Sequence, residues 1–324
     1  MSGPLLVIDA TYLAHRAFHA LGDLAHGGVG TGAVFGVLKD IVYLQDFFKT
    51  NRVAFAFDVG RGHRNDILPT YKSSRHARHA EESDVEKEAR ADFAVQVKKL
   101  RTHYLPNAGF MNVFSAVGFE ADDIIASICA GLPEDDEAII VGTDQDLWQC
   151  LRKNVWIWNP HKKQAYTRIA FIAEWGIFPR RWAEVKALAG CATDDVVGVR
   201  GAGEVTVARF LRGDLPAHHK IHAVLAGTGA REVRDRNMPI VKLPFPGTPK
   251  FTIQPDEVTE EKWAAMAAEL GMKSIAGAAP RGAERKKRGR KPRSVKCCEH
   301  DHDNDGNCHI HSAPGVYRRK GFEL

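Results

Sequence analysis

Three short apolar runs stand out in the first half of the chain, and a carboxylate follows each of them within three residues. The runs are Leu5 to Ile8, Val53 to Phe57 and Ala138 to Val141, and their length is typical of buried strands. Residues 31–48, 81–100 and 120–129 have patterns typical of helices. Apolar strands separated by helices predict an α/β fold with a mostly parallel central sheet.

The pattern changes after about residue 163, where strand signals fade and helical spacing dominates. We therefore expect a sheet-containing unit over residues 1–163 and a smaller helical unit over 164–276. Residues 277–324 are strongly polar and basic, so they are predicted to form a disordered tail. The length of 324 residues is enough for two units that each bury a core.

The net positive charge of the chain is concentrated in that predicted tail. The net charge is +5, and residues 281–324 hold twelve Lys and Arg against six Asp and Glu, so the rest of the chain sums to about −1. The chain has no apolar run long enough to span a membrane and no signal-peptide pattern, which predicts a soluble cytoplasmic protein. Three of the six cysteines lie in the tail and three are scattered, a spacing that argues against a disulfide framework.

Aspartates follow all three predicted strands. Asp9, Asp58 and Asp144 come at or just after the carboxyl ends, and Asp146 follows two residues later. The carboxyl ends of parallel strands meet at one edge of an α/β sheet, which is where such folds place their ligand sites. We therefore expect these acids to gather at that edge.

A second acidic group begins the helix predicted at residue 120. Glu120 and Asp123 are three residues apart and share a face, whereas Asp122 joins them only if the first turn is irregular. So many carboxylates repel one another unless divalent cations neutralise them. Oxygen ligands without His or Cys favour Mg²⁺ or Mn²⁺ over zinc. The alternative reading of any single pair is a solvated loop or a helix cap.

The motifs that hold these acids resemble the 5′ nuclease family of flap endonucleases and 5′-3′ exonucleases, which occurs in phages and as the amino-terminal domain of bacterial DNA polymerase I. The resemblance rests on "LLVIDATYLAHRAFHAL", "FDVGRGHRNDILPTYKSSR", "GFEADDIIASI" and "GTDQDLWQCL" and extends over residues 5–215. It implies a PIN-like fold and a stand-alone nuclease of a bacterium or phage-infected cell. DNA replication and repair are the processes in which such enzymes act.

The resemblance implies hydrolysis of phosphodiester bonds with two metal ions, Mg²⁺ or Mn²⁺, leaving a 5′-phosphate. The basic segment Arg64, Tyr71, Lys72 and Arg75 matches catalytic positions, and Arg16 matches a phosphate contact. Family members form an arch or clamp over the segment that corresponds to residues 71–106 here, through which a single 5′ strand passes. A solvated basic helix is the alternative reading of this segment.

One motif departs from the family pattern. Where relatives read Gly-Asp-x-x-Asp-Asn, this chain has "GCATDD", so Cys191 replaces the first aspartate, Asp194 keeps the second and Asp195 takes the asparagine position. A neutral thiol is a poor ligand for magnesium, so the second metal position is expected to be weakened. Asp194 and Asp195 remain candidate ligands there.

Gly198, Gly201 and Gly203 then lie in "GVRGAGEVTVARFL", ahead of a predicted helix. Backbone N–H groups at such a helix start suit a DNA phosphate whatever the base. The resemblance implies a helix-hairpin-helix motif whose carbonyl groups bind a monovalent cation such as K⁺. An ordinary glycine turn is the alternative.

The tail carries two further motifs. "ERKKRGRKPR" resembles an AT-hook, though nonspecific attraction to DNA explains its charge as well. "CCEHDHDNDGNCHIH" has the ligands of a zinc site and also half of a calcium loop, but a polar disordered tail accounts for it too.

Three functions fit the sequence. The first is a monomeric Mg²⁺-dependent 5′ nuclease acting on branched or 5′-ended DNA, or RNA-DNA, without sequence preference. The second is a junction-binding protein of the same fold that the Cys191 change has inactivated, and the third is a PIN-class ribonuclease. The retained acids oppose the second, and the glycine hairpin opposes the third.

Overall fold

The computed structural model describes residues 3–22, 24–60 and 62–283. The AT-hook-like arm and the Cys/His/Asp motif lie outside the described residues. No helix in this part of the chain is long and apolar enough to cross a membrane.

A six-stranded sheet forms the centre of the protein, with the strand order β5-β4-β1-β6-β7-β8. All neighbouring strands are parallel except β7 and β8, which form an antiparallel pair at one edge. The mostly parallel sheet confirms the predicted fold class. The strands are β1 (Leu5–Asp9), β4 (Val53–Ala56), β5 (Val113–Phe114), β6 (Ala138–Val141), β7 (Val155–Asn159) and β8 (Gln164–Tyr166).

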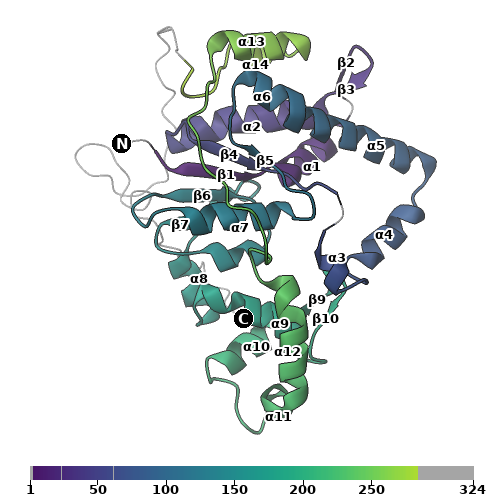
Figure 1. Ribbon diagram of the computed structural model, residues 1–324, viewed down its shortest axis with the longest axis vertical. Coiled ribbons are helices and arrows are strands. Elements are labelled where there is room, and N and C mark those ends of the chain that lie inside the picture. The colour runs from purple at the N-terminus through teal and green to yellow at the C-terminus, as the bar shows by residue number, and fades with distance from the viewer. Residues whose placement is uncertain (1–2, 23, 61, 284–324) are drawn as a thin grey trace, which may run out of the picture.

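Alternate residues of the central strands point to opposite faces of the sheet, and each face packs against its own core. Leu6 and Ile8 of β1 belong to one apolar cluster, whereas Leu5 and Val7 belong to the other. Burial on both faces explains why these strands read as continuous apolar runs. Figure 1 shows the two helical layers, above and below the sheet.

Helices from the first third of the chain build the upper layer. These are α1 (Ala10–Leu21), α2 (Gly32–Phe48), α5 (Asp84–Lys99) and α6 (Leu105–Ala108), with the π turn η1 (Leu100–Tyr104) between the last two. Ser83 begins α5 with a capping box to Glu86, which is why the helix starts there. The hairpin β2 (Ala25–His26) and β3 (Val29–Gly30) precedes α2, and α3 (Arg64–Ile67) and α4 (Ser73–Ala80) precede α5.

The layer below the sheet begins with α7 (Ala121–Gly131) and continues into a group of short helices. Trp148, Phe171, Trp175 and Trp182 form an aromatic cluster that joins this group to the sheet. The remaining elements are η2 (Asp146–Cys150), α8 (Arg168–Trp175), η3 (Pro179–Arg181), α9 (Trp182–Ala189), β9 (Gly190–Cys191), η4 (Ala192–Asp194), β10 (Val196–Val197), α10 (Glu204–Leu211), α11 (Lys220–Ala226) and α12 (Thr228–Val241).

The chain then returns to the upper layer, which the sequence pattern did not predict. Residues 242–258 form neither helix nor strand as they cross the molecule, and α13 (Glu260–Glu269) and α14 (Lys273–Ala276) pack beside α2 and α6 (Figure 1). Trp263 of α13 is fully buried there and donates its indole N–H to the carbonyl of Ile275 over 2.8 Å. The segment predicted as one helical unit over 164–276 therefore divides between two layers.

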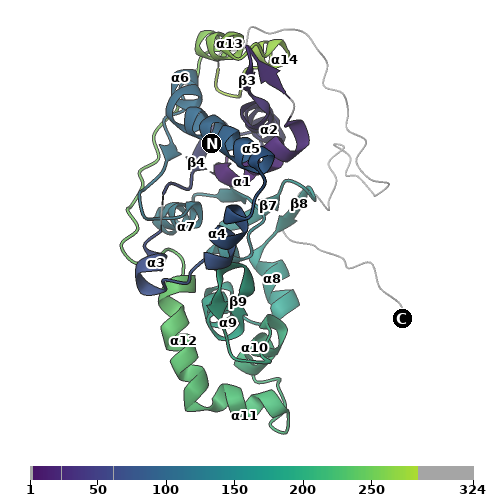
Figure 2. The ribbon, with the colours of Figure 1, turned by 90° about the vertical axis from the view of Figure 1, so that its right-hand side faces the viewer.

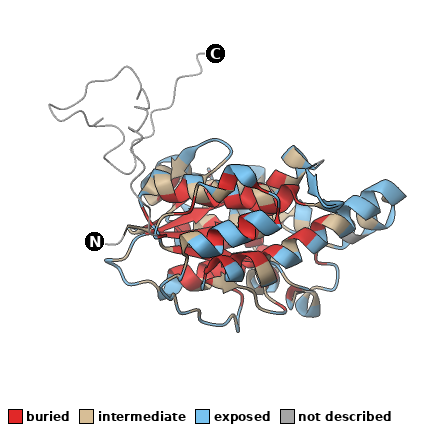
Figure 3. Cartoon of the chain, turned by 90° about the horizontal axis from the view of Figure 1, so that it is seen from above, coloured by how far each residue is buried: buried red, intermediate tan, exposed pale blue. Residues whose placement is uncertain are grey.

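The predicted start of the tail also lies within this packing. Ala279 and Ala283 are buried, and the backbone N–H of Arg281 donates to the side chain of Gln45 over 3.1 Å. Residues 277–283 are therefore part of the folded body. Figure 3 shows the buried residues gathered through the middle of the molecule, with exposed residues along α4 and the start of α5.

Candidate active site

A cavity of about 350 Å³ opens at the carboxyl edge of the sheet, on the side where α3 and α4 lie. Figure 2 views the molecule from that side, with α4 in front of the strand ends. An acid that lines the cavity stands at the end of β1 and shortly after the ends of β4 and β6, where the sequence predicts it. The acids that line it are Asp9, Asp58, Glu120, Asp122, Asp144, Asp146 and Asp194.

Four of these acids lack a basic partner. No Lys, Arg or His of the described chain lies within ion-pair distance of Asp9, Asp58, Asp122 or Asp144. Backbone N–H groups are the donors to three of them: Tyr12 to Asp9 over 2.9 Å, Ala121 to Asp58 over 2.9 Å, and Asp146 to Asp144 over 2.7 Å. The local folds therefore fix the positions of these carboxylates without neutralising their charge.

Burial and repulsion from neighbouring acids raise the pKa values of Asp9 and Asp122. Burial, followed by the charges of Asp58 and Asp144, raises the pKa of Asp9 to about 8. Burial and the charges of Asp144, Asp9 and Asp58 likewise raise the pKa of Asp122 well above its ordinary value. Each carboxylate disfavours the ionised form of its neighbours. No basic side chain of the described residues neutralises this set of four acids.

The other acids of the cavity are paired with basic side chains. Lys72 Nζ lies 2.6 Å from Glu120 Oε1 and 4.0 Å from Asp194 Oδ1, and Arg75 lies 3.5 Å from Asp194. The Tyr71 hydroxyl donates to Glu120 over 3.1 Å. Although burial opposes it, attraction to Glu120 and Asp194 raises the pKa of Lys72. Tyr71, Lys72 and Arg75 of the predicted basic segment therefore line the same cavity as the acids.

Lys186 pairs with Asp146, a contact that the sequence did not reveal. Its Nζ lies 3.0 Å from Asp146 Oδ1 and 3.2 Å from Glu204 Oε1, and the residue is buried. Burial is the main reason that the pKa of Asp146 rises to about 6, and Lys186 opposes the rise. A single lysine in the apolar run of α9 reads as an ordinary helix residue. Its distance in sequence from Asp146 concealed the pair.

Asp123 was predicted among the metal ligands, but the structure turns it away from the cavity. It is completely buried, and its two oxygens accept from the Arg64 guanidinium over 2.6 and 2.8 Å. Asp123 also accepts from the backbone N–H of Glu120, so it serves as the third-position partner in the cap of α7. That role directs it into the core and leaves Asp122 facing the cavity, the reverse of the expectation from helical spacing.

Arg64 is held just as firmly. Besides Asp123, its Nε donates to the carbonyl of Ile240 over 2.8 Å, and its guanidinium lies 5.0 Å from the ring centroid of Phe245. Attraction to Asp123, against the opposing effect of burial, raises the pKa of Arg64. Arg64 therefore joins α3, α7 and the end of α12. Arg64 also lines the acidic cavity, 3.5 Å from Glu120 Oε2, so its predicted action on the substrate stays a prediction.

Two further predicted residues lie apart from the acids. Asp195 has a left-handed backbone, with φ of 57°, and its carboxylate accepts from the backbone N–H of Ser74 over 2.8 Å at the start of α4. Arg16 pairs with Asp40, which joins α1 to α2. Neither residue lines the acidic cavity. Asp195 points away because adjacent residues rarely face the same way.

Cys191 lines the cavity as a free thiol. Its Sγ lies 3.1 Å from the Thr193 hydroxyl and 3.4 Å from Asp194 Oδ2. Burial raises the pKa of the Cys191 thiol, which therefore stays protonated and neutral around pH 7. The thiol supplies no negative charge at the position where the family pattern has an aspartate.

His15 of α1 also lines the cavity and was not predicted from the sequence. Its ring stacks on Phe93 of α5, with 4.0 Å between the ring centroids. Burial, with the nearby His19, lowers the pKa of His15. No sequence signal marked this position, because lone histidines on helices are common.

The three predicted glycines lie between β10 and α10. Gly198 has no room for a Cβ because the carbonyl of Ala189 lies against it, and Gly201 has φ of 82°. Gly203 forms the N-terminal cap of α10, where open space surrounds it. Two of these positions therefore require glycine to close the turn.

The acids are not yet arranged as the ligands of one ion. In the part of the chain that the structure describes, no three His, Cys, Asp or Glu side chains already surround a common point. The donor chemistry nevertheless suits a hard divalent cation, because carboxylates supply all the negative charge and four of them lack a basic partner.

Comparison with known proteins identifies the nuclease class to which this parallel sheet with an acidic edge belongs. The family described as "5'-3' exonuclease, N-terminal resolvase-like domain" matches residues 4–176. The chain therefore belongs to the 5′-3′ exonuclease family.

Individual relatives are similar to this chain in sequence or in fold. A 5′-3′ exonuclease of Bacillus subtilis is 30% identical over 221 residues, which are 64% of this chain and 69% of that protein. A DNA polymerase I of Mycobacterium leprae is 29% identical over 219 residues, 64% of this chain but 22% of the polymerase, so the chain spans about a fifth of that relative. A bacteriophage T5 flap endonuclease, solved with DNA and metal ions, has a TM-score of 0.63 at 20% identity, over 84% of this chain and 99% of that one.

Proposed function

We propose that the protein hydrolyses phosphodiester bonds at the 5′ ends or 5′ flaps of DNA, using two divalent cations, Mg²⁺ or Mn²⁺. The observation that carries the proposal is the set of four carboxylates lining the acidic cavity, Asp9, Asp58, Asp122 and Asp144, that lack a basic partner among the described residues. A purely structural site gains nothing from such repulsion, whereas a cation converts it into binding energy.

These four acids would hold the first cation, with their side chains drawn inward around it. Glu120, Asp146 and Asp194 would contribute to the second, but Lys72, Lys186 and Arg75 already neutralise them in part. When bound, such cations activate a water molecule, orient the phosphate and stabilise the leaving oxygen. The neutral Cys191 thiol adds no charge there, so the second cation would bind more weakly than the first.

Lys72 and Arg75 would bind the scissile phosphate, since both line the cavity beside the acids. A neighbouring cavity of about 930 Å³ continues from Asp58 and His15 along α4 and α5, where Arg75, Arg78 and Arg90 line it. Five Lys and Arg residues and four acids line this cavity, and the small excess of positive charge supports passage of a single 5′ strand, in keeping with an arch over residues 71–106. The fixed charges would hold the strand while the phosphate reaches the acids.

The turn at Gly198, Gly201 and Gly203 would contact the duplex part of the substrate. Backbone N–H groups at the start of α10 suit phosphates without reading the bases. In a helix-hairpin-helix motif the carbonyls of such a turn also take up a monovalent cation, and K⁺ is the ion that we propose here.

A flap-cleavage assay tests this function. Wild-type protein with Mg²⁺ should cut a labelled 5′-flap duplex, and Asp144→Asn should reduce the rate by about 10³-fold or more, since it removes an unpaired ligand. Asp235→Asn, an exposed aspartate on α12, is the matched control and should leave the rate unchanged. Equal cutting by wild type and Asp144→Asn would contradict the proposal. A parallel RNA flap would measure the preference between DNA and RNA.

Cys191→Asp distinguishes the nuclease from a binding protein of the same fold. The substitution restores an acid beside Asp194, so it should preserve or raise cleavage and lower the Mg²⁺ concentration needed for half-maximal rate. A protein that binds flaps tightly but cuts none of them, before and after this substitution, would be the junction-binding alternative.

A further inference from the structure

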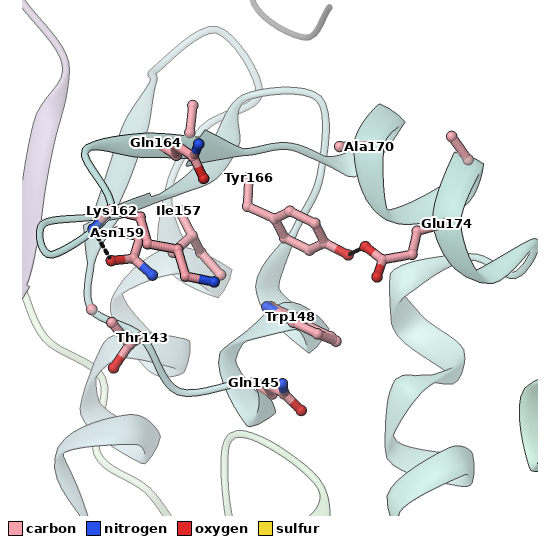
Figure 4. A pocket seen from close by; sticks show the side chains of 13 residues that line it. Thr143, Gln145, Trp148, Ile157, Asn159, Lys162, Gln164, Tyr166, Ala170 and Glu174 are labelled. Carbon is pink, nitrogen blue, oxygen red and sulfur yellow. Dashed lines mark hydrogen bonds between the residues drawn. The ribbon is translucent and has the colours of Figure 1, made fainter. Parts of the chain in front are cut away.

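A second cavity, of about 680 Å³, lies beside the acidic one and has a different chemistry. It is enclosed by η2, β7, β8 and α8, and Figure 4 shows the side chains around it. Thr143 lines both cavities, and Gln145, which stands between Asp144 and Asp146 in sequence, lines this one. A ligand here would therefore lie next to the acids without touching them.

Aromatic rings line one side of this cavity. The ring centroids of Trp148 and Tyr166 are 5.0 Å apart with their planes tilted by 37°. The Tyr166 hydroxyl donates to the carboxylate of Glu174 over 2.8 Å, which fixes the orientation of the ring (Figure 4). Flat apolar faces of this kind stack on any of the four nucleobases.

Amide and hydroxyl groups line the rest. Asn159 Oδ1 accepts from the backbone N–H groups of His161 and Lys162 over 3.0 and 2.9 Å, which orients its amide (Figure 4). Its NH₂ group is thereby left as a donor toward the cavity. Together with the Gln145 amide and the Thr143 hydroxyl, it offers hydrogen bonds to the polar edge of a base.

The charge of the cavity excludes a phosphate as its principal ligand. Lys162 and Glu174 are its only charged lining residues in the described chain, and they are opposite in sign. The acidic cavity, by contrast, is flanked by Lys72 and Arg75. A near-neutral aromatic cavity favours the base of a nucleotide, and the basic side chains favour its phosphate.

We infer that this cavity binds one unpaired nucleobase of the substrate, stacked against Trp148 and Tyr166, while the backbone of that strand runs toward the acids. The inference rests on the proposed function and adds a base-binding subsite to it. Holding a base outside its stack costs energy, which contact with aromatic rings offsets. The subsite would thus select substrates that have an unpaired base at one fixed distance from the cut.

An abasic scan tests the subsite. Flap substrates with a single abasic position, moved one nucleotide at a time, are bound to protein in the cleavage-deficient Asp144→Asn background, and Kd is measured by fluorescence anisotropy. One position should weaken binding about tenfold, the size expected for the loss of one stacked base. Its neighbours should have little effect.

Two variants change the cavity in opposite ways. Tyr166→Ala removes a stacking face, and Ala170→Phe fills the space from α8. Both variants should bind the intact flap more weakly than the parent protein. An abasic site at the sensitive position should not weaken their binding any further. Tyr43→Ala, an exposed tyrosine on α2, is the matched control and should keep the full sensitivity. Melting temperatures would verify that all variants fold.

The inference is overturned if no abasic position weakens binding, or if the same loss persists in both cavity variants. Cleavage by wild-type protein is measured in parallel with Mg²⁺. If the wild type cuts flaps while the scan is flat, the subsite alone is wrong, whereas absence of cutting overturns the proposed function itself.

Discussion

The ammonium group of Lys186 lies 3.0 Å from Asp146, at the meeting point of α9 and η2. The two residues are far apart in sequence, and the lysine side chain is nearly buried. Lys186 also contacts Glu204 at the start of α10. One basic side chain therefore joins the acidic edge of the sheet to the helices that carry the glycine turn.

Removing Lys186 should destabilise the protein. Lys186→Met leaves Asp146 and Glu204 without their cation, and breaking a buried ion pair from one side costs about 3 kcal/mol. Urea denaturation monitored by tryptophan fluorescence would measure the loss. Lys242→Met, at an exposed position, serves as the control and should change the unfolding free energy by less than about 0.5 kcal/mol. Equal stability of both variants would show that the pair is unimportant.

Replacing either of the two adjacent aspartates at the start of α7 with asparagine should change the unfolding free energy in opposite directions. Asp123→Asn breaks the bidentate pair with Arg64 inside the core, so the unfolding free energy should fall by about 3 kcal/mol. Asp122→Asn removes one of the mutually repelling charges, so the metal-free protein should become more stable, while flap cleavage is lost.

A double-mutant cycle separates the two roles further. Because Arg64 and Asp123 act as a unit, Arg64→Met combined with Asp123→Asn should cost clearly less than the sum of the single changes. Additive costs would mean that the pair is not coupled. If Asp122→Asn lowered stability as much as Asp123→Asn, the distinction drawn between these neighbours would be wrong.

The metal-free protein should lose stability as pH rises from about 4 to about 8. Burial and Asp58 raise the pKa of Asp9 to about 8 in the folded state, compared with about 4 in the unfolded chain. The folded state thus holds a proton that the unfolded state has released, which lowers the unfolding free energy by up to about 1.4 kcal/mol per pH unit. Melting temperatures in EDTA would follow this decline.

Asp9→Asn should reduce that dependence without abolishing it, because burial also raises the pKa of Asp122. His15 contributes the opposite trend below about pH 6.5, because burial lowers its pKa and the resulting destabilisation disappears as pH rises to that value. That contribution is common to both proteins and cancels in their difference. Added Mg²⁺ at about pH 8 should raise the melting temperature of the wild type, by ligand linkage. Identical pH profiles for the wild type and Asp9→Asn would refute this account.

Two glycines of the turn before α10 provide another matched pair. Gly198→Ala places a methyl group against the carbonyl of Ala189, so it should distort the β9-β10 hairpin, lower the melting temperature and weaken binding to duplex DNA. Gly203→Ala meets open space at a cap where the backbone is extended, so it should be tolerated within about 1 kcal/mol. Equal effects on melting temperature and Kd would contradict the steric argument.

The strand ends and their acids could be predicted from sequence because both are local. β1, β4 and β6 are continuous apolar runs, and parallel topology alone brings Asp9, Asp58 and Asp144 to one edge. β7 and β8 were missed because their aromatic and polar residues follow no clear alternation. The crossing segment 242–258 carries no periodic signal, so the return of α13 and α14 to the upper layer could not be predicted.

The pattern of apolar and polar residues predicts neither the direction in which a side chain points nor its partners from distant parts of the sequence. Helical spacing put Asp123 with Glu120 on one face, but the cap of α7 uses Asp123 inward and leaves Asp122 facing the acids. The sequence shows the charge of Arg64 and Arg16 but not their partners, Asp123 and Asp40. Lys186 was missed for the same reason.

The crossing of residues 242–258 back to the upper layer has a mechanical consequence. The helices from α8 to α12 are anchored at both ends, through β8 on one side and through this segment, which donates Phe245 N–H to Asp123, on the other. These helices also share an apolar core with the sheet, so packing as well as the two chain connections holds them in place. Truncating the chain after α12 would remove one of these connections. It would also remove Trp263 from the core of the upper layer, so packing would be lost on the opposite side of the sheet from α12.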